Sequence, residues 1–364
     1  MTDVGELKQF GLVHTKTQGI PPDEFERISA LITNDEDGAD GSWAAEWNRA
    51  AGAIDLQGHP ELAYRYYAMA RFPYIDGPTR RYALHQCVAD FGAAHAGQGF
   101  ERLDLEIGGG RVGCWAVGLS ATEPKPLLVV TGGIVAAKEQ YAPMMALATS
   151  LGMAGLVTEM PGVGENTLSY DAKSWELFPA LLDAVGDRAD VEHTYAMALS
   201  FSGHLALRAA THDRRIKGIV AAAAPVSDFY TDDDWHRRLP RITADTLAHL
   251  TDTELPELAD HMRDWALTPA ELASLTIPVY CMGSDGDEII PPGEIGHLRR
   301  HVRDLHVLSY RDAHAAPRHV TETQTWLLHS VLTMRGGSPR ERLRLGAKLR
   351  YLRWRRLIGQ WRGK

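Results

Sequence analysis

The chain has few of the features that would place it in an oxidising, metal-binding or membrane-spanning class. Among its 364 residues are three cysteines (Cys87, Cys114 and Cys281), far apart and with no Cys-x-x-Cys pair. This pattern excludes a disulfide framework and a zinc ribbon. No apolar run approaches the roughly 20 residues of a membrane span, and the acidic start lacks the pattern of a signal peptide. We therefore expect a cytoplasmic protein with no metal site.

The net charge of −9 hides an asymmetry between the body and the C-terminal segment. Residues 335–364 hold eleven Lys and Arg against one acid, which gives that segment +10 and leaves −19 on the rest. A body this acidic excludes general nucleic-acid binding. Residues 336–364 are predicted to form a basic amphipathic helix, with apolar stripes at Leu345, Leu349 and Leu352 and at Trp354, Leu357, Ile358 and Trp361. We expect this helix to pack on the acidic body or in a homodimer, and contact with a membrane surface stays open.

The apolar pattern changes along the chain. Residues 1–98 have helical periodicity and predict a helical N-terminal domain. Across 99–335 short apolar strands alternate with helices, interrupted by an acidic helical insertion at 228–275. Continuous apolar strands of this kind predict an α/β fold, with a doubly wound, mostly parallel sheet covered on both faces. The strands are expected near 103–107, 111–119, 126–130, 154–159, 194–199, 216–224, 278–283 and 305–310.

A serine stands where one of these strands ends. The strand 194–199 stops at Ser200, and small residues and a helical pattern follow. This layout is typical of a nucleophile elbow, in which a tight turn exposes the serine hydroxyl. Ala198 and Ser202, two residues before and after it, are small enough for the turn. A serine that caps a helix after a buried strand would give a similar pattern, but we predict Ser200 as a nucleophile.

A serine hydroxyl needs a base, and the base needs an acid that orients it. In doubly wound hydrolases these follow in the order serine, acid, histidine. We predict Asp287, which follows the strand 278–283, as the acid, with Asp285 as the alternative. The segment that holds both residues could also be a turn on the surface. His314 follows the strand 305–310, with His319 as the alternative. Because all three groups occur in the required order, each after its own strand, we predict a serine, aspartate and histidine triad.

An acyl-transfer site also needs donors for the oxyanion. The turn 131–134 (Thr-Gly-Gly-Ile) follows the first parallel strand, so we predict the backbone N–H of Ile134 as one donor and that of Phe201 as the other. Gly133 is expected beside the substrate. A second glycine turn at 160–165 lacks the Gly-Lys-Ser/Thr of a phosphate loop and is expected to shape the pocket. No cofactor is implied.

Several motifs together resemble those of the FrsA-like α/β-hydrolases. They are Gly-Gly-Ile-x-x-x-Lys-Glu at 132–139, Met-Pro-Gly-x-Gly-Glu at 160–165, Ala-Leu-Ser-Phe-Ser-Gly at 198–203, His-Asp-x-Arg-Ile-Lys at 212–217, and the aromatic pairs Trp43/Trp47 and Tyr66/Tyr67. The resemblance covers about residues 40–335 and excludes the basic tail. It implies an esterase, a carbon–carbon bond hydrolase or a polyketide-shortening enzyme. By position, the family's triad maps onto Ser200, Asp287 and His314.

We therefore expect a serine hydrolase that cleaves an ester or an activated carbon–carbon bond, of the β-diketone or acyl-aryl kind, through an acyl-enzyme. The N-terminal helices and the insertion should cap the site and exclude water. Asp228, Phe229, Tyr230 and Trp235 of the insertion are expected to contact an aromatic or polyketide-like small molecule. An acyltransferase or cyclase that releases a polyketide chain is the alternative, and a non-catalytic protein on the hydrolase fold is a third interpretation.

Overall fold

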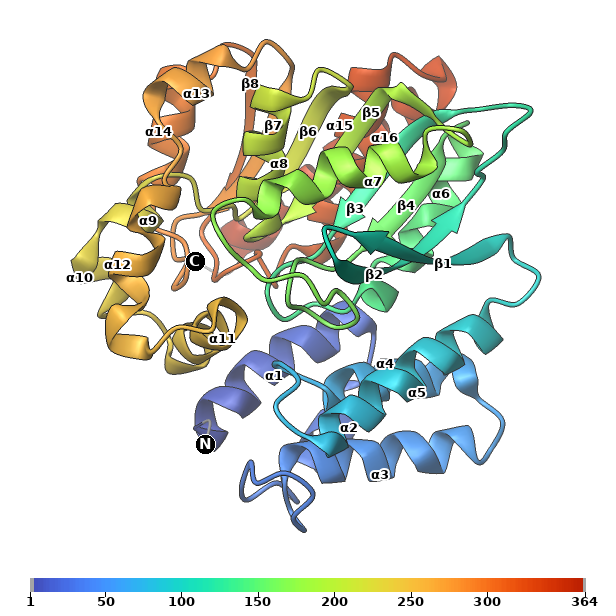
Figure 1. Cartoon of the computed structure of the whole chain (residues 1–364), viewed down its shortest axis with the longest axis vertical. Helices are drawn as coiled ribbons and strands as arrows, with labels where there is room; N and C mark the ends of the chain where they lie inside the picture. The colour runs from blue at the N-terminus through green and yellow to red at the C-terminus, as the bar shows by residue number, and fades with distance from the viewer. Residues whose placement is uncertain (1–2, 363–364) are drawn as a thin grey trace.

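The computed structural model describes residues 3–362, and for 357–362 it describes the backbone only. The chain folds around an eight-stranded sheet with the order β1-β2-β4-β3-β5-β6-β7-β8 (Figure 1). The β1–β2 and β2–β4 pairs are antiparallel and all other pairs are parallel. This confirms the predicted mostly parallel sheet. The strands are β1 (Phe100–Ile107), β2 (Gly110–Val117), β3 (Pro126–Thr131), β4 (Ala154–Thr158), β5 (Asp190–Leu199), β6 (Ile216–Ala222), β7 (Val279–Ser284) and β8 (Leu305–Tyr310).

Alternate residues of the central strands belong to two separate hydrophobic cores. In β3, Leu127 and Val129 join one core, and Leu128 and Val130 join the other; all four are fully buried. The first core includes side chains of α7 (Leu177–Val185) and α8 (Ser202–His212), and the second those of α6 (Met145–Ser150) and α15 (Val320–Arg335). The central strands β3 and β4 are almost entirely apolar because both faces of the sheet are covered there.

Five helices precede the sheet: α1 (Val4–Gln18), α2 (Pro22–Ser29), α3 (Trp43–Asp55), α4 (Pro60–Ala70) and α5 (Pro78–Ala94). The last two, like α2, begin at a proline, whose missing N–H is not needed there. Trp43 and Trp47 of α3 are fully buried with their ring centroids 5.7 Å apart. They belong to the same core as Val130 of β3. These helices therefore share a hydrophobic core with one face of the sheet.

The insertion after β6 is helical, as expected, and one of its helices meets α1. Its helices are α9 (Asp228–Thr231), α10 (Asp233–His236), α11 (Arg241–Thr251), α12 (Leu258–Met262) and α13 (Pro269–Ser274). The carboxylate of Glu6 in α1 accepts hydrogen bonds from the backbone N–H groups of Arg241 (3.1 Å) and Ile242 (2.7 Å). These donors at the start of α11 have no partner within their own helix. Figure 1 shows α1 beside α11.

The basic tail forms α16 (Pro339–Arg362), which packs on α15. Leu349 is buried, and the carboxylate of Glu322 on α15 lies 3.5 Å from both Arg353 and Arg356. The described part of the tail thus packs on the body of the same chain, one of the predicted arrangements. The side chains of Leu357, Ile358 and Trp361, which were expected to extend the second stripe, lie outside the described residues. Within the described residues, no helix is both long and apolar enough to cross a bilayer.

Candidate active site

Ser200 occupies a strained turn between β5 and α8. Its φ angle is +57°, in the left-handed region that residues other than glycine rarely adopt. Its backbone N–H donates a 2.7 Å hydrogen bond to the carbonyl of Ala222 on β6, which holds the turn against the neighbouring strand. The N-cap residue of α8 is Phe201, and no side chain caps this helix. The interpretation of Ser200 as a capping residue is therefore wrong, and its geometry is that of an elbow.

The structure brings Ser200, His314 and Asp287 together. The hydroxyl Oγ of Ser200 lies 3.1 Å from Nε2 of His314, and Nδ1 of the same ring lies 3.0 Å from both carboxylate oxygens of Asp287. Asp287 also accepts hydrogen bonds from the N–H groups of Ile289 (2.9 Å) and Ile290 (2.8 Å), which orient its carboxylate. This is the geometry of a serine, histidine and aspartate triad, in which the histidine accepts the serine proton and the aspartate orients the ring.

The alternative residues Asp285 and His319 lie elsewhere. Asp285 is exposed, and its N–H pairs with the carbonyl of Tyr310. The ring of His319 stacks on the ring of Tyr310 with centroids 4.3 Å apart. Neither residue has a recorded contact with Ser200 among the described residues, so the structure favours the first choices over the alternatives.

The surroundings of His314 favour its protonated form. Burial lowers the pKa of His314, but the charge and hydrogen bond of Asp287 and the charge of Glu288 outweigh burial, so the pKa is raised above its ordinary 6.5. Glu288 also accepts a 3.0 Å hydrogen bond from the backbone N–H of His314. Both carboxylates would thus stabilise the imidazolium that forms when the ring takes a proton from Ser200.

The predicted oxyanion donors lie beside the serine. Ile134 and Phe201 line the same cavity as Ser200, and within the described chain neither backbone N–H has a recorded acceptor. A side chain at Gly133 would come within 2.9 Å of the Cβ of Ser200, so only glycine allows the turn to lie this close. Two free N–H groups next to a serine hydroxyl match the requirements of an oxyanion hole.

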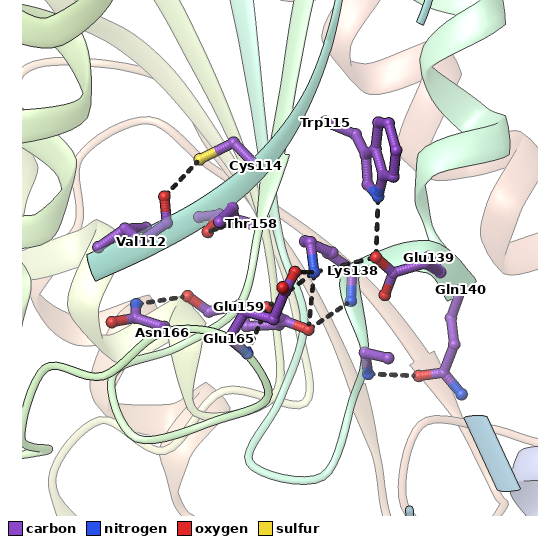
Figure 2. Close-up of polar contacts among 12 residues, drawn as sticks. Val112, Cys114, Trp115, Lys138, Glu139, Gln140, Thr158, Glu159, Glu165 and Asn166 are labelled. Carbon is purple, nitrogen blue, oxygen red and sulfur yellow. Dashed lines mark hydrogen bonds and ion pairs between the residues drawn. The ribbon is translucent and has the colours of Figure 1, made fainter. Parts of the chain in front are cut away.

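A buried ionic cluster anchors the segment that follows this turn (Figure 2). The ammonium of Lys138 lies 2.9 Å from Glu139, 3.4 Å from Glu159 and 2.6 Å from Glu165. The indole N–H of Trp115 donates to Glu139 at 2.8 Å. The cluster links the segment after β3 to the glycine turn at 160–165, which follows β4. Through Glu165, that turn therefore anchors the segment that follows the predicted oxyanion donor Ile134. None of the residues 160–165 lines the cavity at Ser200, so the expectation that this turn shapes the pocket is wrong.

The cluster places one ammonium among three carboxylates, and Arg102 contacts one of them, Glu165, at 2.8 Å. Burial lowers the pKa of Lys138, but the three surrounding carboxylates outweigh burial and raise it. Burial raises the pKa of Glu159 to about 7, against the opposing attraction of Lys138. Ions in such a site are stable only while each keeps its partners.

A cavity of about 540 Å³ opens above Ser200 and His314. Its lining is mostly apolar and comes from segments far apart in the chain, including Phe10 and His14 of α1, Tyr64 of α4, Phe72, Ile242 of α11 and Leu327 of α15. Both the N-terminal helices and the insertion therefore contribute to the roof. Among the described residues, no group of three or more His, Cys, Asp or Glu could hold a metal ion.

The structure corrects the prediction of four substrate contacts in the insertion. Gly133 lines the cavity, whereas Asp228, Phe229, Tyr230 and Trp235 do not. Phe229 and Tyr230 are fully buried in the first core. Asp228 lies 2.6 Å from Nε2 of His297, and Trp235 donates to the carbonyl of Ile289 at 2.8 Å. The first two helices of the insertion pack against the body, and α11 reaches the cavity through Ile242 and Thr243.

Several polar groups of the cavity were not anticipated. His14 and Gln18 come from α1, and Tyr141 and Thr243 from the segments after β3 and β6. None lies in a motif. Tyr141 lies against the turn at Gly132, whereas His14, Gln18 and Thr243 reach the site through the packing of helices distant in the chain. Sequence periodicity predicts a buried helix face but does not say which buried residue faces a cavity.

This fold and this site define an α/β-hydrolase, and the protein is a hydrolase enzyme. The model of the family described as "Esterase FrsA-like" matches residues 41–292, which is more than half of the chain. The chain therefore belongs to the FrsA-like family, as its motifs indicated.

Individual relatives agree with this assignment. Esterase FrsA of Vibrio cholerae serotype O1 is 22% identical over 313 residues, which cover 75% of each chain. The solved structure "AbyA5 Wildtype" is 47% identical with a TM-score of 0.93, over 96% of this chain and all of that one. A 2,6-dihydroxy-pseudo-oxynicotine hydrolase shares the fold at 17% identity and a TM-score of 0.66, over 88% of this chain and 96% of that one.

Proposed function

We propose that this protein is a serine hydrolase that cleaves an ester or an activated carbon–carbon bond of an aromatic or polyketide-like molecule. One observation carries the proposal. The Ser200 hydroxyl, 3.1 Å from Nε2 of His314, lies at the wall of a roofed cavity, and Asp287 holds the other nitrogen of the same ring. A hydroxyl in that position can be deprotonated as it attacks a carbonyl.

The mechanism uses groups already in place. His314 takes the proton of Ser200 while the oxygen attacks the substrate carbonyl. The N–H groups of Ile134 and Phe201 then stabilise the oxyanion, and the protonated ring of His314 gives its proton to the leaving group. Water, activated by the same histidine, releases the acyl group from Ser200. Asp287 stabilises the imidazolium in both steps.

The nature of the cavity supports the substrate class. The lining is mostly apolar and includes the aromatic side chains of Phe10, Tyr64 and Phe72. Apolar walls with a few polar groups are typical of sites for small organic molecules. For a carbon–carbon bond to break, the leaving carbon must be stabilised as an enolate or a phenol-type ring, which a β-diketone or an acyl-aryl compound provides.

A fluorophosphonate probe tests whether Ser200 is a nucleophile. We expect the wild type to be labelled in an active-site-directed reaction, the Ser200→Ala variant to remain unlabelled, and His314→Ala to be labelled far more slowly. Ser274→Ala, which changes an exposed serine of α13, is the matched control and should label like the wild type. Labelling that persists in Ser200→Ala, or a wild type that does not label, would overturn the proposal.

Product analysis in heavy-oxygen water separates hydrolysis from acyl transfer. Hydrolysis of the acyl-enzyme places one solvent oxygen in the released acid. An acyltransferase or cyclase would instead give a product whose new bond contains no solvent oxygen. We expect the label to appear in the acid product.

A further inference from the structure

Helix α1 brings a second imidazole into the site, one that the mechanism above does not use. His14 lines the cavity that also contains Ser200 and His314. Its ring packs on Phe72, with centroids 4.8 Å apart. The helix, Val4–Gln18, precedes residues 41–292, the range matched by the family model. His14 thus lies outside the part of the chain that identifies the family.

The ring of His14 has unused hydrogen-bonding capacity. The backbone carbonyl of this residue accepts a bond from the hydroxyl of Thr17, but neither ring nitrogen has a recorded hydrogen-bond partner within the described chain. Burial, together with the positive charges of Arg71 and His314, lowers the pKa of His14 to about 3. The ring is therefore neutral at physiological pH and offers one N–H donor and one acceptor nitrogen. Polar groups enclosed in apolar surroundings are ordinarily paired, and here the cavity is the open side.

The position of His14 limits which part of a substrate it can meet. His14 and His314 line the same cavity of about 540 Å³. Nε2 of His314 is in turn 3.1 Å from the hydroxyl that attacks the substrate. A substrate atom that contacts His14 therefore lies in the same enclosed space as the carbonyl that Ser200 attacks.

We propose that His14 is a specificity-determining residue, whose neutral ring forms a hydrogen bond with a second oxygen of the substrate, a few bonds from the carbonyl that Ser200 attacks. This proposal rests on the proposed function. It assigns to α1 the selection of oxygenated acyl groups over plain alkyl ones. A site built to pair with a substrate oxygen discriminates strongly against an analogue that lacks it.

Two esters that differ at one position test this assignment: 4-nitrophenyl 3-oxobutanoate and 4-nitrophenyl 3-methylbutanoate, which carries a methyl group in place of the oxygen. For each ester, kcat/KM is measured for the wild type, His14→Phe and His14→Gln. The value of each variant is divided by that of the wild type on the same ester, so that the intrinsic reactivity of the ester cancels. We expect His14→Phe to lower kcat/KM for the oxo ester about tenfold more than for the methyl ester, the usual size of one lost hydrogen bond. His14→Gln, which keeps a donor and an acceptor, should restore part of the difference.

The controls separate the possible failures. His85→Phe, which changes an exposed histidine of α5, should behave like the wild type, and thermal denaturation checks that the His14 variants are folded. Equal losses for the two esters would overturn the proposal, because His14 would then not distinguish the oxygen. The proposal would also be overturned if fluorophosphonate labels Ser200 of the wild type but the wild type turns over neither ester. A wild type that is not labelled at Ser200 would instead contradict the proposed function itself.

Discussion

The guanidinium of Arg71, which is fully buried at the end of α4, donates a hydrogen bond to the backbone carbonyl of Val135. Val135 directly follows Ile134, whose N–H we propose as an oxyanion donor. The N-terminal helices therefore do more than cover the cavity, because one of their side chains fixes the orientation of the turn after β3. The other two guanidinium nitrogens of Arg71 have no recorded partner among the described residues.

Replacing Arg71 with methionine should reduce activity by displacing this turn. The carbonyl of Val135 would lose its donor, and a misplaced oxyanion donor weakens binding of the transition state more than that of the substrate. We expect kcat for 4-nitrophenyl butanoate to fall about tenfold with a smaller change in KM, and Arg71→Lys to retain part of the activity. Arg81→Met, at an exposed position of α5, is the control. A change in KM alone would show that Arg71 does not act through the turn.

The pH profile of the enzyme should reflect the environment of His314. The ring accepts the serine proton only when it is neutral, and its pKa is raised above 6.5 mainly by Asp287. The acidic limb of kcat/KM should therefore lie above pH 6.5, with activity rising as pH increases through it. In Asp287→Asn we expect this limb at lower pH and a plateau reduced by about 10³- to 10⁴-fold, since the orienting carboxylate is lost. An unchanged limb in that variant would exclude His314 as the base.

The main elements of the fold and the central groups of the site could be predicted because each depends on a local pattern. Residues 126–130 are apolar at every position, which indicates a strand covered on both faces. Ser200, Asp287 and His314 each follow a strand of the parallel part of the sheet, and parallel strands end at the same edge of the sheet. Chain order and strand position therefore indicated where the three groups lie, but only the structure separates Asp287 from Asp285 and His314 from His319.

The roof of the cavity could not be predicted in the same way. Phe229 and Tyr230 were expected to contact substrate because they are aromatic, but the first core buries both. His14 and Ile242 reach the cavity because Glu6 caps α11 and so joins α1 to the insertion across more than 230 residues of sequence. No pattern in a single sequence indicates such a contact. Aromatic residues alone do not distinguish a packed cap from a binding surface.

A buried histidine should make the protein sensitive to acid. Burial lowers the pKa of His204 on α8 to about 3, with a further contribution from Arg208, and its Nε2 lies 2.7 Å from the carbonyl of Trp265. Below its unfolded-state pKa of about 6.5, the unfolded chain takes up a proton that the folded chain does not, so stability falls as pH decreases. Between pH 7.5 and 5 this residue should account for about 2 kcal/mol of lost unfolding free energy.

Urea unfolding at the two pH values measures this contribution. We expect His204→Gln to lose about 2 kcal/mol less than the wild type on acidification, whatever its stability at pH 7.5. His85→Gln, at an exposed site on α5, should lose as much as the wild type. If His204→Gln and the wild type respond equally to acid, the neutral state of His204 does not govern this part of the stability.

The buried ionic cluster leads to a prediction about both stability and its pH dependence. In Lys138→Met the carboxylates of Glu139 and Glu159 would lose their shared cation inside the protein, whereas Glu165 would keep Arg102 at 2.8 Å. Removing one partner of a buried ionic group typically costs about 3–5 kcal/mol. We expect a loss of this size by urea unfolding at pH 7.5, against less than about 1 kcal/mol for Arg27→Met in the exposed pair with Glu24.

Acidification should reduce the damage in Lys138→Met. Without the lysine, the pKa of Glu159, which burial already raises to about 7, rises further, so the folded variant binds more protons than the unfolded chain, and its stability increases as pH falls. The difference between Lys138→Met and the wild type should therefore be smaller at pH 5 than at pH 7.5. A loss equal to that of Arg27→Met at pH 7.5 would contradict this account, because it would mean that the carboxylates find other partners or water when Lys138 is removed.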